Sequence, residues 1–159
     1  MDRPCSTIPR RHAAAVLLLA LCAAMLPATL PQAAGAPDTL AGTWLTDDGD
    51  SKVEIAPARA ADGSTASNGK VVWLKSPTRD GQPLRDTNNA DPSLRSRPIL
   101  GLEMVSGFRA DGSGGWTGGT VYSPRAGKRY PAEATLDADG RLQIKVRAGL
   151  VTRTVTWTR

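Results

Sequence analysis

The stretch "RLQIKVRAGLVTRTVTWTR", residues 141–159, ends the chain with two alternating segments that meet at Ala148 and Gly149. In the first segment Leu142, Ile144 and Val146 alternate with charged or amide side chains. This period of two predicts a strand with one packed face and one solvated face. The second segment alternates in the same way, and the short Ala-Gly link indicates a hairpin between them.

Arg153 breaks the pattern of the last segment, because it shares a face with Val155 and Trp157 while three threonines take the other face. A buried guanidinium needs a partner, and an aromatic ring is a suitable one. Trp44 lies in the first expected strand, and the first and last strands are neighbours in an up-and-down barrel. We therefore expect Arg153 to lie on Trp44 and to close the barrel together with Trp157. The alternative is that the threonine face is inside and Arg153 is solvated.

Turn signals rich in Gly, Asp, Asn and Ser recur along the rest of the chain at nearly regular intervals, and no amphipathic helical pattern separates them. This spacing is typical of an all-β sandwich or barrel. The interpretation adopted here is a single eight-stranded up-and-down antiparallel β-barrel. Its expected strands lie near residues 42–47, 51–57, 68–75, 99–109, 115–122, 128–136, 141–147 and 150–158.

The start of the chain has the layout of a secretory signal peptide. Arg3, Arg10 and Arg11 precede an apolar stretch from Ala13 to Leu26, and small residues follow it. We expect residues 1–36 to be cleaved and residues 37–159 to form one domain in the periplasm or outside the cell. The apolar stretch is too short for a comfortable membrane span, so none is expected in the mature form. Lipid attachment at Cys22 is disfavoured by the bulky Leu21 before it.

The composition of the expected mature chain excludes several chemistries. The only cysteines, Cys5 and Cys22, and the only histidine, His12, all lie before residue 37. Without them a Cys nucleophile, a Ser-His-Asp triad, a disulfide or a thiolate or imidazole metal site is not expected. Three arginines and one aspartate also precede residue 37, which lowers the net charge from +5 to +3. Because the remaining basic residues are scattered and aromatics are few, no nucleic-acid partner is expected.

A long connection, "DTNNADPSLRSRPILGL" at 86–102, is the least regular part of the expected domain. Asp91 before Pro92 predicts a helix cap and one short helical turn, from which Leu94 would pack inward. Arg97 is expected to pair with Asp86 or Asp91. The connection is then either a self-satisfied lid, or a ligand mouth built from Asp86, Asn89 and Arg97.

A set of residues spread over the expected mature chain matches a known family pattern. These residues are Gly42, Trp44, Gly69, Lys70, Trp73, Asp86, Asn89, Leu94, Arg97, Pro98, Gly101, Gly118, Tyr122, Pro124, Gly127, Lys128, Tyr130, Arg153, Thr154, Trp157 and Arg159. In them the chain resembles the domain of unknown function 2147 family, a group of small secreted bacterial proteins. The resemblance covers essentially the whole expected mature chain and implies a lipocalin-like β-barrel, without an established activity.

Three functions remain open from the sequence. The leading hypothesis is a non-catalytic module that binds a small apolar or amphipathic molecule, because eight strands enclose room for side chains or one small ligand. Its candidate ligand or loop residues are Asp86, Asn89, Arg97, Tyr122 and Tyr130. The alternative is a structural or protein-interaction component of the bacterial cell envelope with a filled barrel. An enzyme is the third reading, with acid and base drawn from groups such as Asp86, Glu103 and Glu133. No cofactor or metal is expected, and the oligomeric state is not defined.

Overall fold

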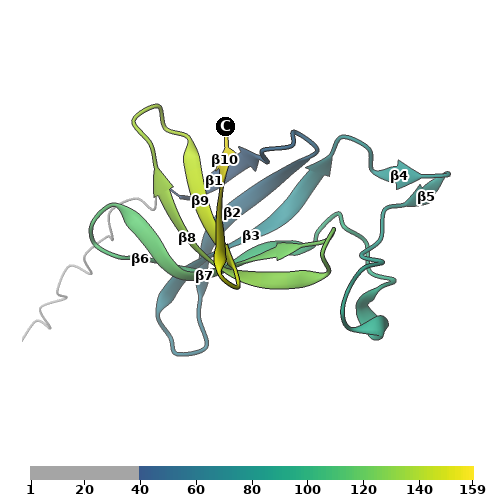
Figure 1. Cartoon of the computed structure of the whole chain (residues 1–159), viewed down its shortest axis with the longest axis horizontal. Coiled ribbons are helices and arrows are strands. Elements are labelled where there is room, and N and C mark those ends of the chain that lie inside the picture. Colours follow the sequence, from purple (N-terminus) through teal and green to yellow (C-terminus); the bar gives the residue numbers. More distant parts are fainter. Residues whose placement is uncertain (1–39) are drawn as a thin grey trace, which may run out of the picture. The chain divides into compact units, whose positions relative to one another are not determined.

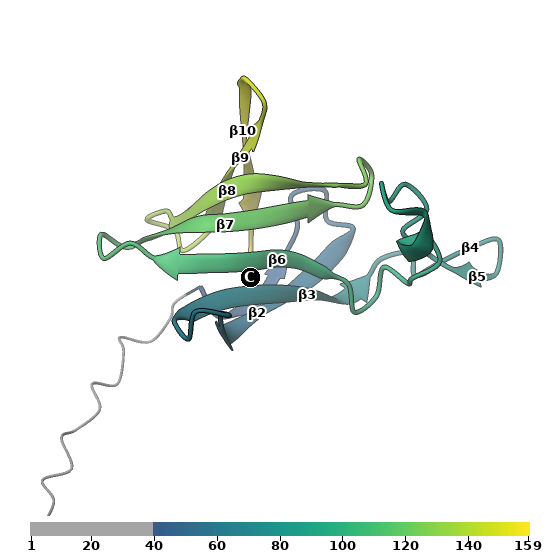
Figure 2. The same cartoon turned by 90° about the horizontal axis from the view of Figure 1, so that it is seen from below.

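A computed structural model of the protein describes residues 40–159, which form an antiparallel β-structure (Figures 1 and 2). The expected signal peptide, with Cys5, His12 and Cys22, lies outside these residues. Within residues 40–159 no helix is long and apolar enough to cross a membrane.

Eight strands form one curled sheet in the order β1-β2-β3-β6-β7-β8-β9-β10, so that each strand of this sheet pairs with the one that follows it within the sheet along the chain. The expectation of an eight-stranded up-and-down sheet is confirmed. The strands are β1 (Gly42–Leu45), β2 (Ser51–Arg59), β3 (Thr65–Leu74), β6 (Glu103–Ala110), β7 (Gly115–Ser123), β8 (Lys128–Leu136), β9 (Leu142–Ala148) and β10 (Val151–Trp157).

The connection from β3 to β6, residues 75–102, contains the remaining elements and is here called the long connection. It begins with a small hairpin, β4 (Thr78–Arg79) and β5 (Gln82–Pro83), that sequence analysis missed. Asp80 and Gly81 turn this hairpin with φ angles of 52° and 73°, which is the conformation that Asp-Gly pairs favour in two-residue turns. The strand expected from residue 99 starts only at Glu103, because Ile99 to Leu102 form a turn closed by the Leu102 N–H on the Ile99 carbonyl at 3.0 Å.

The two edges of the sheet meet next to the C-terminus. Leu45 and Thr158 form an isolated antiparallel bridge, in which the Leu45 N–H donates to the Thr158 carbonyl at 2.6 Å and the Thr158 N–H donates back at 3.1 Å. Along β10 itself, the only strand of the described part of the chain that pairs with it is β9. The seam between β1 and β10 is therefore joined by backbone at one point and remains open beside most of β10.

Apolar side chains fill the interior near this junction. Trp44 is completely buried and Trp157 is 2% exposed. The indole N–H of Trp44 donates to the Leu40 carbonyl at 2.9 Å. On β9 the alternation is as expected, because Leu142 and Ile144 are buried while Lys145 and Arg147 are exposed. Toward the other end of the strands, residues such as Val146 and Val155 are only half-buried.

The expected stacking of Arg153 on Trp44 is wrong, and Arg159 takes that place. The Arg159 guanidinium lies 4.4 Å from the centroid of the Trp44 ring and donates to the Ala41 carbonyl at 3.1 Å. Because the edges meet at Thr158, Trp44 faces the end of the chain, while Arg153 is four residues, or about 13 Å, before Trp157 along the strand. The Arg153 side chain is 76% exposed and crosses the open part of the seam to Asp47 at 3.6 Å.

Replacing these two arginines separately tests which one stabilises the closed sheet. We expect Arg159→Ala to lower the free energy of unfolding by about 1 kcal/mol, because it removes the cation–π contact with a buried indole. Arg153→Ala removes an exposed ion pair and should cost at most about 0.5 kcal/mol. Urea unfolding followed by tryptophan fluorescence measures both values, and an equal or larger loss in Arg153→Ala would contradict this assignment.

Candidate functional site

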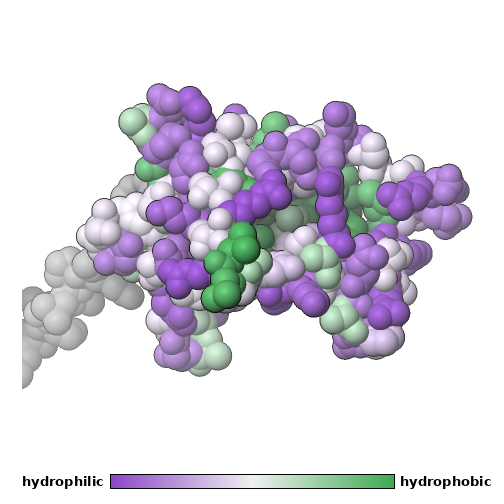
Figure 3. All heavy atoms as spheres, in the orientation of Figure 1, coloured by the Kyte–Doolittle hydropathy of each residue, from purple (hydrophilic) through white to green (hydrophobic). Residues whose placement is uncertain are grey.

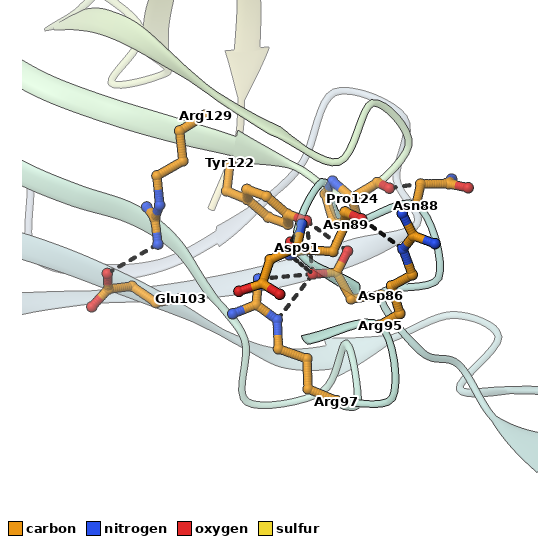
Figure 4. Close-up of polar contacts among 10 residues, drawn as sticks. All are labelled: Asp86, Asn88, Asn89, Asp91, Arg95, Arg97, Glu103, Tyr122, Pro124 and Arg129. Carbon is orange, nitrogen blue, oxygen red and sulfur yellow. Dashed lines mark hydrogen bonds and ion pairs between the residues drawn. The ribbon is translucent and has the colours of Figure 1, made fainter. Parts of the chain in front are cut away.

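The long connection is fastened to the outer side of β7 by a buried carboxylate. Asp86 has no exposed surface, and its oxygens accept hydrogen bonds from the Tyr122 hydroxyl at 2.7 Å and the Asn89 amide at 2.7 Å. Arg97 donates to the same carboxylate through Nε at 2.9 Å and Nη2 at 2.7 Å (Figure 4). The expected Arg97 pairing is therefore made with Asp86, and its charge lies directly against the buried carboxylate.

Tyr122 and Arg97 keep their donor protons in this environment. Burial raises the pKa of the Tyr122 phenol above its ordinary value, and the hydrogen bond to Asp86 adds to the rise. Burial lowers the pKa of Arg97, but its hydrogen bonds and attraction to Asp86 outweigh this effect, so the pKa is raised overall. The guanidinium groups of Arg97 and Arg129 also lie 5.3 and 5.7 Å from the Tyr122 ring centroid, within cation–π range.

The same connection also packs against the turn between β7 and β8. Asn88 donates its side-chain amide to the carbonyls of Pro124 at 3.4 Å and Arg125 at 3.2 Å, and the Ala90 N–H donates to the Gly127 carbonyl at 3.3 Å. Gly127 has a φ of 64°, and a Cβ placed there would overlap the carbonyl of Asn88. Only glycine therefore allows the connection to lie so close to this turn.

The predicted helical turn is present as η1 (Pro92–Leu94), a single 3-10 turn. The Asp91 carboxylate accepts from the Ser93 N–H at 2.9 Å and from its hydroxyl at 2.7 Å, as expected of a cap. The expectation that Leu94 packs inward is wrong, because Leu94 is 39% exposed. A three-residue turn on the outside of the sheet has no interior to face.

Two adjoining pockets open at the end of the sheet where the β1–β2, β7–β8 and β9–β10 turns lie. The first, here called the apolar pocket, has a volume of about 360 Å³. Its walls come from β6 to β10 and include Val121, Tyr130, Val146 and Val155. These side chains belong to the inward face of the sheet, so the pocket is the unfilled continuation of the core. Arg153 lies at its edge, beside Val155.

The second, here called the polar pocket, has a volume of about 370 Å³ and lies between the sheet and the long connection. Apolar groups such as Leu84 and Ile99 line one part of it. Its remaining lining carries the arginines Arg79, Arg85 and Arg125, together with hydroxyl and amide groups. The two pockets share Asp48, Met104, Pro124 and Arg125.

An ion-pair bridge crosses the boundary between the pockets. Arg125, in the β7–β8 turn, lies 3.3 Å from a carboxylate oxygen of both Asp48 and Asp50 in the β1–β2 turn. The other oxygen of Asp48 accepts from the Thr46 hydroxyl at 2.7 Å and the Asp50 N–H at 3.1 Å. Partial burial raises the pKa of Asp48, but these hydrogen bonds and the Arg125 charge outweigh it and hold the pKa below its usual value.

The structure thus brings together four of the five ligand or loop candidates. Asp86, Asn89, Arg97 and Tyr122 form one cluster, whereas Tyr130 lies in the apolar pocket. The groups of the polar pocket escaped sequence analysis, because its arginines come from the long connection and from the distant β7–β8 turn, with no shared motif. Trp44, Arg153 and Trp157, the residues expected to close the barrel, lie along or beside the seam, with Arg153 bound to Asp47.

The carboxylates considered for catalysis each have an arginine partner of their own. Glu103 lies 3.5 Å from Arg129, and Glu133 lies 2.8 Å from Arg147. Among residues 40–159, no group of three or more His, Cys, Asp or Glu side chains is placed to hold a metal ion.

Comparison with known proteins identifies the family of this fold. The family described as "Uncharacterized protein conserved in bacteria (DUF2147)" matches residues 42–159. The chain belongs to this family. Among solved structures, the chain is similar to one titled "Protein HP1028 from the human pathogen Helicobacter pylori belongs to the lipocalin family". The match has 23% identity and a TM-score of 0.61, and covers 76% of this chain and 82% of the other. The lipocalin-like fold is therefore shown. A search of curated proteins returned no significant match.

Removing the buried carboxylate tests whether it holds the long connection in place. We expect Asp86→Ala to lower the free energy of unfolding by about 3 kcal/mol or more, because it leaves the Tyr122, Asn89 and Arg97 donors without their acceptor. Asp62→Ala, which removes an exposed pair with Arg109 and exposed hydrogen bonds from Ser64, is the control and should cost much less. Urea denaturation measures both, and similar small losses would contradict the structural role of Asp86.

Proposed function

We propose that this DUF2147 protein is an exported, non-catalytic binding module that holds a small apolar or amphipathic molecule in its apolar pocket. The observation that carries the proposal is that side-chain packing changes along the inward face of the sheet, from filled to open. Large side chains such as Trp44 and Trp157 fill one part of the interior, while Val121, Val146 and Val155 line an open volume of about 360 Å³. A volume of this order is within the range of small-ligand sites.

Two further features support this reading. Tyr130 gives the apolar pocket a hydroxyl on an aromatic body, and Arg153 and Arg125 lie at its edge. An apolar part of a bound molecule could therefore contact the apolar walls, while a polar end could contact the Tyr130 hydroxyl or the two arginines. The cluster of Asp86, Asn89, Arg97 and Tyr122 contributes by holding the long connection, because its polar groups are already bonded to one another.

Export is part of the proposal and rests on the signal-peptide pattern of residues 1–36. A periplasmic or secreted binding module of this kind needs no cysteine chemistry, which is consistent with the composition of residues 37–159.

The alternative function is a protein-interaction component of the cell envelope. It is favoured by the turn between β9 and β10, where the Leu150 side chain is fully exposed and Val151 is 66% exposed. Figure 3 shows hydrophobic surface beside hydrophilic side chains on this face of the protein. This alternative was expected to have a filled barrel, and the open apolar pocket does not fit that part of it.

Filling the apolar pocket by mutation tests the proposed function. The wild type is expected to bind the neutral fluorophore N-phenyl-1-naphthylamine, and Val155→Phe to weaken that binding by about fivefold or more, because the new ring takes the volume of the probe. Val72→Phe adds the same ring to an exposed position on β3 and should leave the affinity unchanged. Thermal unfolding of both variants controls for folding.

The bound molecule itself is sought in protein purified from its own host. Native mass spectrometry and organic extraction are expected to reveal a co-purified small molecule that is lost in Val155→Phe. Failure of the wild type both to bind the fluorophore and to carry any molecule would reject a binding function and favour the interaction component.

A further inference from the structure

The two pockets differ in chemistry and share part of their lining. Apolar side chains dominate one, although Arg125 and Arg153 also line it. The other carries Arg79, Arg85 and Arg125 beside apolar groups, and Met104 lies in the lining of both. We propose that the ligand is an anionic amphiphile, with its apolar chain in the apolar pocket and its phosphate or carboxylate group among the arginines of the polar pocket. The proposal rests on the proposed function and specifies the class of molecule that is bound.

The charges of the polar pocket favour an anion. Its lining contains Arg79, Arg85 and Arg125 against Asp48 and Asp50, which leaves one excess positive charge. Both aspartates lie against Arg125. Within residues 40–159, no ion pair involves Arg79 or Arg85. The anion would therefore meet these two guanidinium groups without having to displace a carboxylate from them.

Hydrogen bonds hold Arg85 at the polar pocket, where its guanidinium can bind an anion. Its backbone forms a bridge with Pro98, and the next residue is the buried Asp86, whose N–H donates to the Arg97 carbonyl at 3.0 Å. One of its side-chain nitrogens donates to the Ser96 carbonyl, and a guanidinium has further N–H donors available for a ligand. Arginine binds phosphate and carboxylate through paired hydrogen bonds, so two arginines in one pocket suit such a group.

Neutral hydrogen-bond donors and the flexible side chain of Met104 also line the polar pocket. The lining of the polar pocket also includes Ser76 and Thr87, whose hydroxyls can donate to the remaining oxygens of the anion. Met104 is half-buried between the pockets, and an unbranched thioether adapts its rotamer readily to a chain that passes it. A free anion would use only the polar pocket, and a neutral chain only the apolar one.

A series of matched ligands tests the proposal by isothermal titration calorimetry below micelle-forming concentrations. The ligands are decyl phosphate, decanoate, decanol, decyltrimethylammonium and inorganic phosphate. We expect both anionic amphiphiles to bind about tenfold or more tightly than decanol, since charge-assisted hydrogen bonds add to the same apolar contact. Inorganic phosphate should bind far more weakly, and the preference should shrink as salt is added.

The double variant Arg79→Ala/Arg85→Ala is expected to reduce the affinity for decyl phosphate to within about twofold of decanol, while decanol binding stays unchanged. The matched control Arg109→Ala/Arg141→Ala removes two exposed arginines near the opposite end of the sheet and should preserve the preference.

Each contrary outcome has a separate meaning. Equal binding of decanol and decyl phosphate would overturn the anionic class while leaving the proposed binding function intact. Tighter binding of decyltrimethylammonium would overturn it as well, because the aspartates would then be the recognition groups. If inorganic phosphate binds as well as decyl phosphate, the polar pocket is a free-anion site and the amphiphile is rejected. Failure of every ligand in the series and of the apolar fluorophore would reject both proposals.

Discussion

The position of the long connection depends on the buried carboxylate of Asp86. An ionised carboxylate without solvent is costly unless it is paired and fully hydrogen-bonded. Those conditions are met only when the long connection lies against β7, because Arg97 and Asn89 come from the connection and Tyr122 from the strand. Once it is held there, the connection presents Arg85 and Asn88 beside the end of the sheet. The polar pocket therefore forms because burial of the Asp86 carboxylate holds the long connection against β7.

The interior of the curled sheet is packed at one end of the strands and open at the other. Trp44 and Trp157 fill the region next to the single backbone bridge between Leu45 and Thr158. Farther along, β10 has no second partner strand among the described residues, and the seam is crossed by the Arg153–Asp47 ion pair. Small and branched side chains on this inward face leave space that larger ones would fill. The same curled sheet thus supplies both the stability of the core and the walls of the apolar pocket.

Local chemistry made much of the fold predictable from the sequence. The alternation around Ile144 predicted a strand with a wet and a dry face, and Asp91 before Pro92 predicted the helical turn at its observed position. Arg153 was assigned the wrong partner, since the stagger between the first and last strands decides which residue faces Trp44 and no local pattern encodes it. The Asp80-Gly81 hairpin was missed, although that dipeptide is a turn signal in its own right.

The candidate site was less predictable, because it also depends on which distant segments pack together. The cluster around Asp86 was anticipated in part, because Asp86, Asn89 and Arg97 lie within one short segment. The polar pocket draws Arg79, Arg85 and Arg125 from places that only the packing of the long connection brings together. Pockets formed between distant segments leave no periodic or motif signal in a single sequence.

The most direct test of a binding function built on the unfilled interior is a methyl NMR titration of the intact domain with decanol. Progressive shifts are expected to concentrate on Val121, Val146, Val155 and Met104, with little change at the exposed Val72. Shifts confined to outward-facing methyl groups, or no saturable shift at any methyl group, would contradict this binding function.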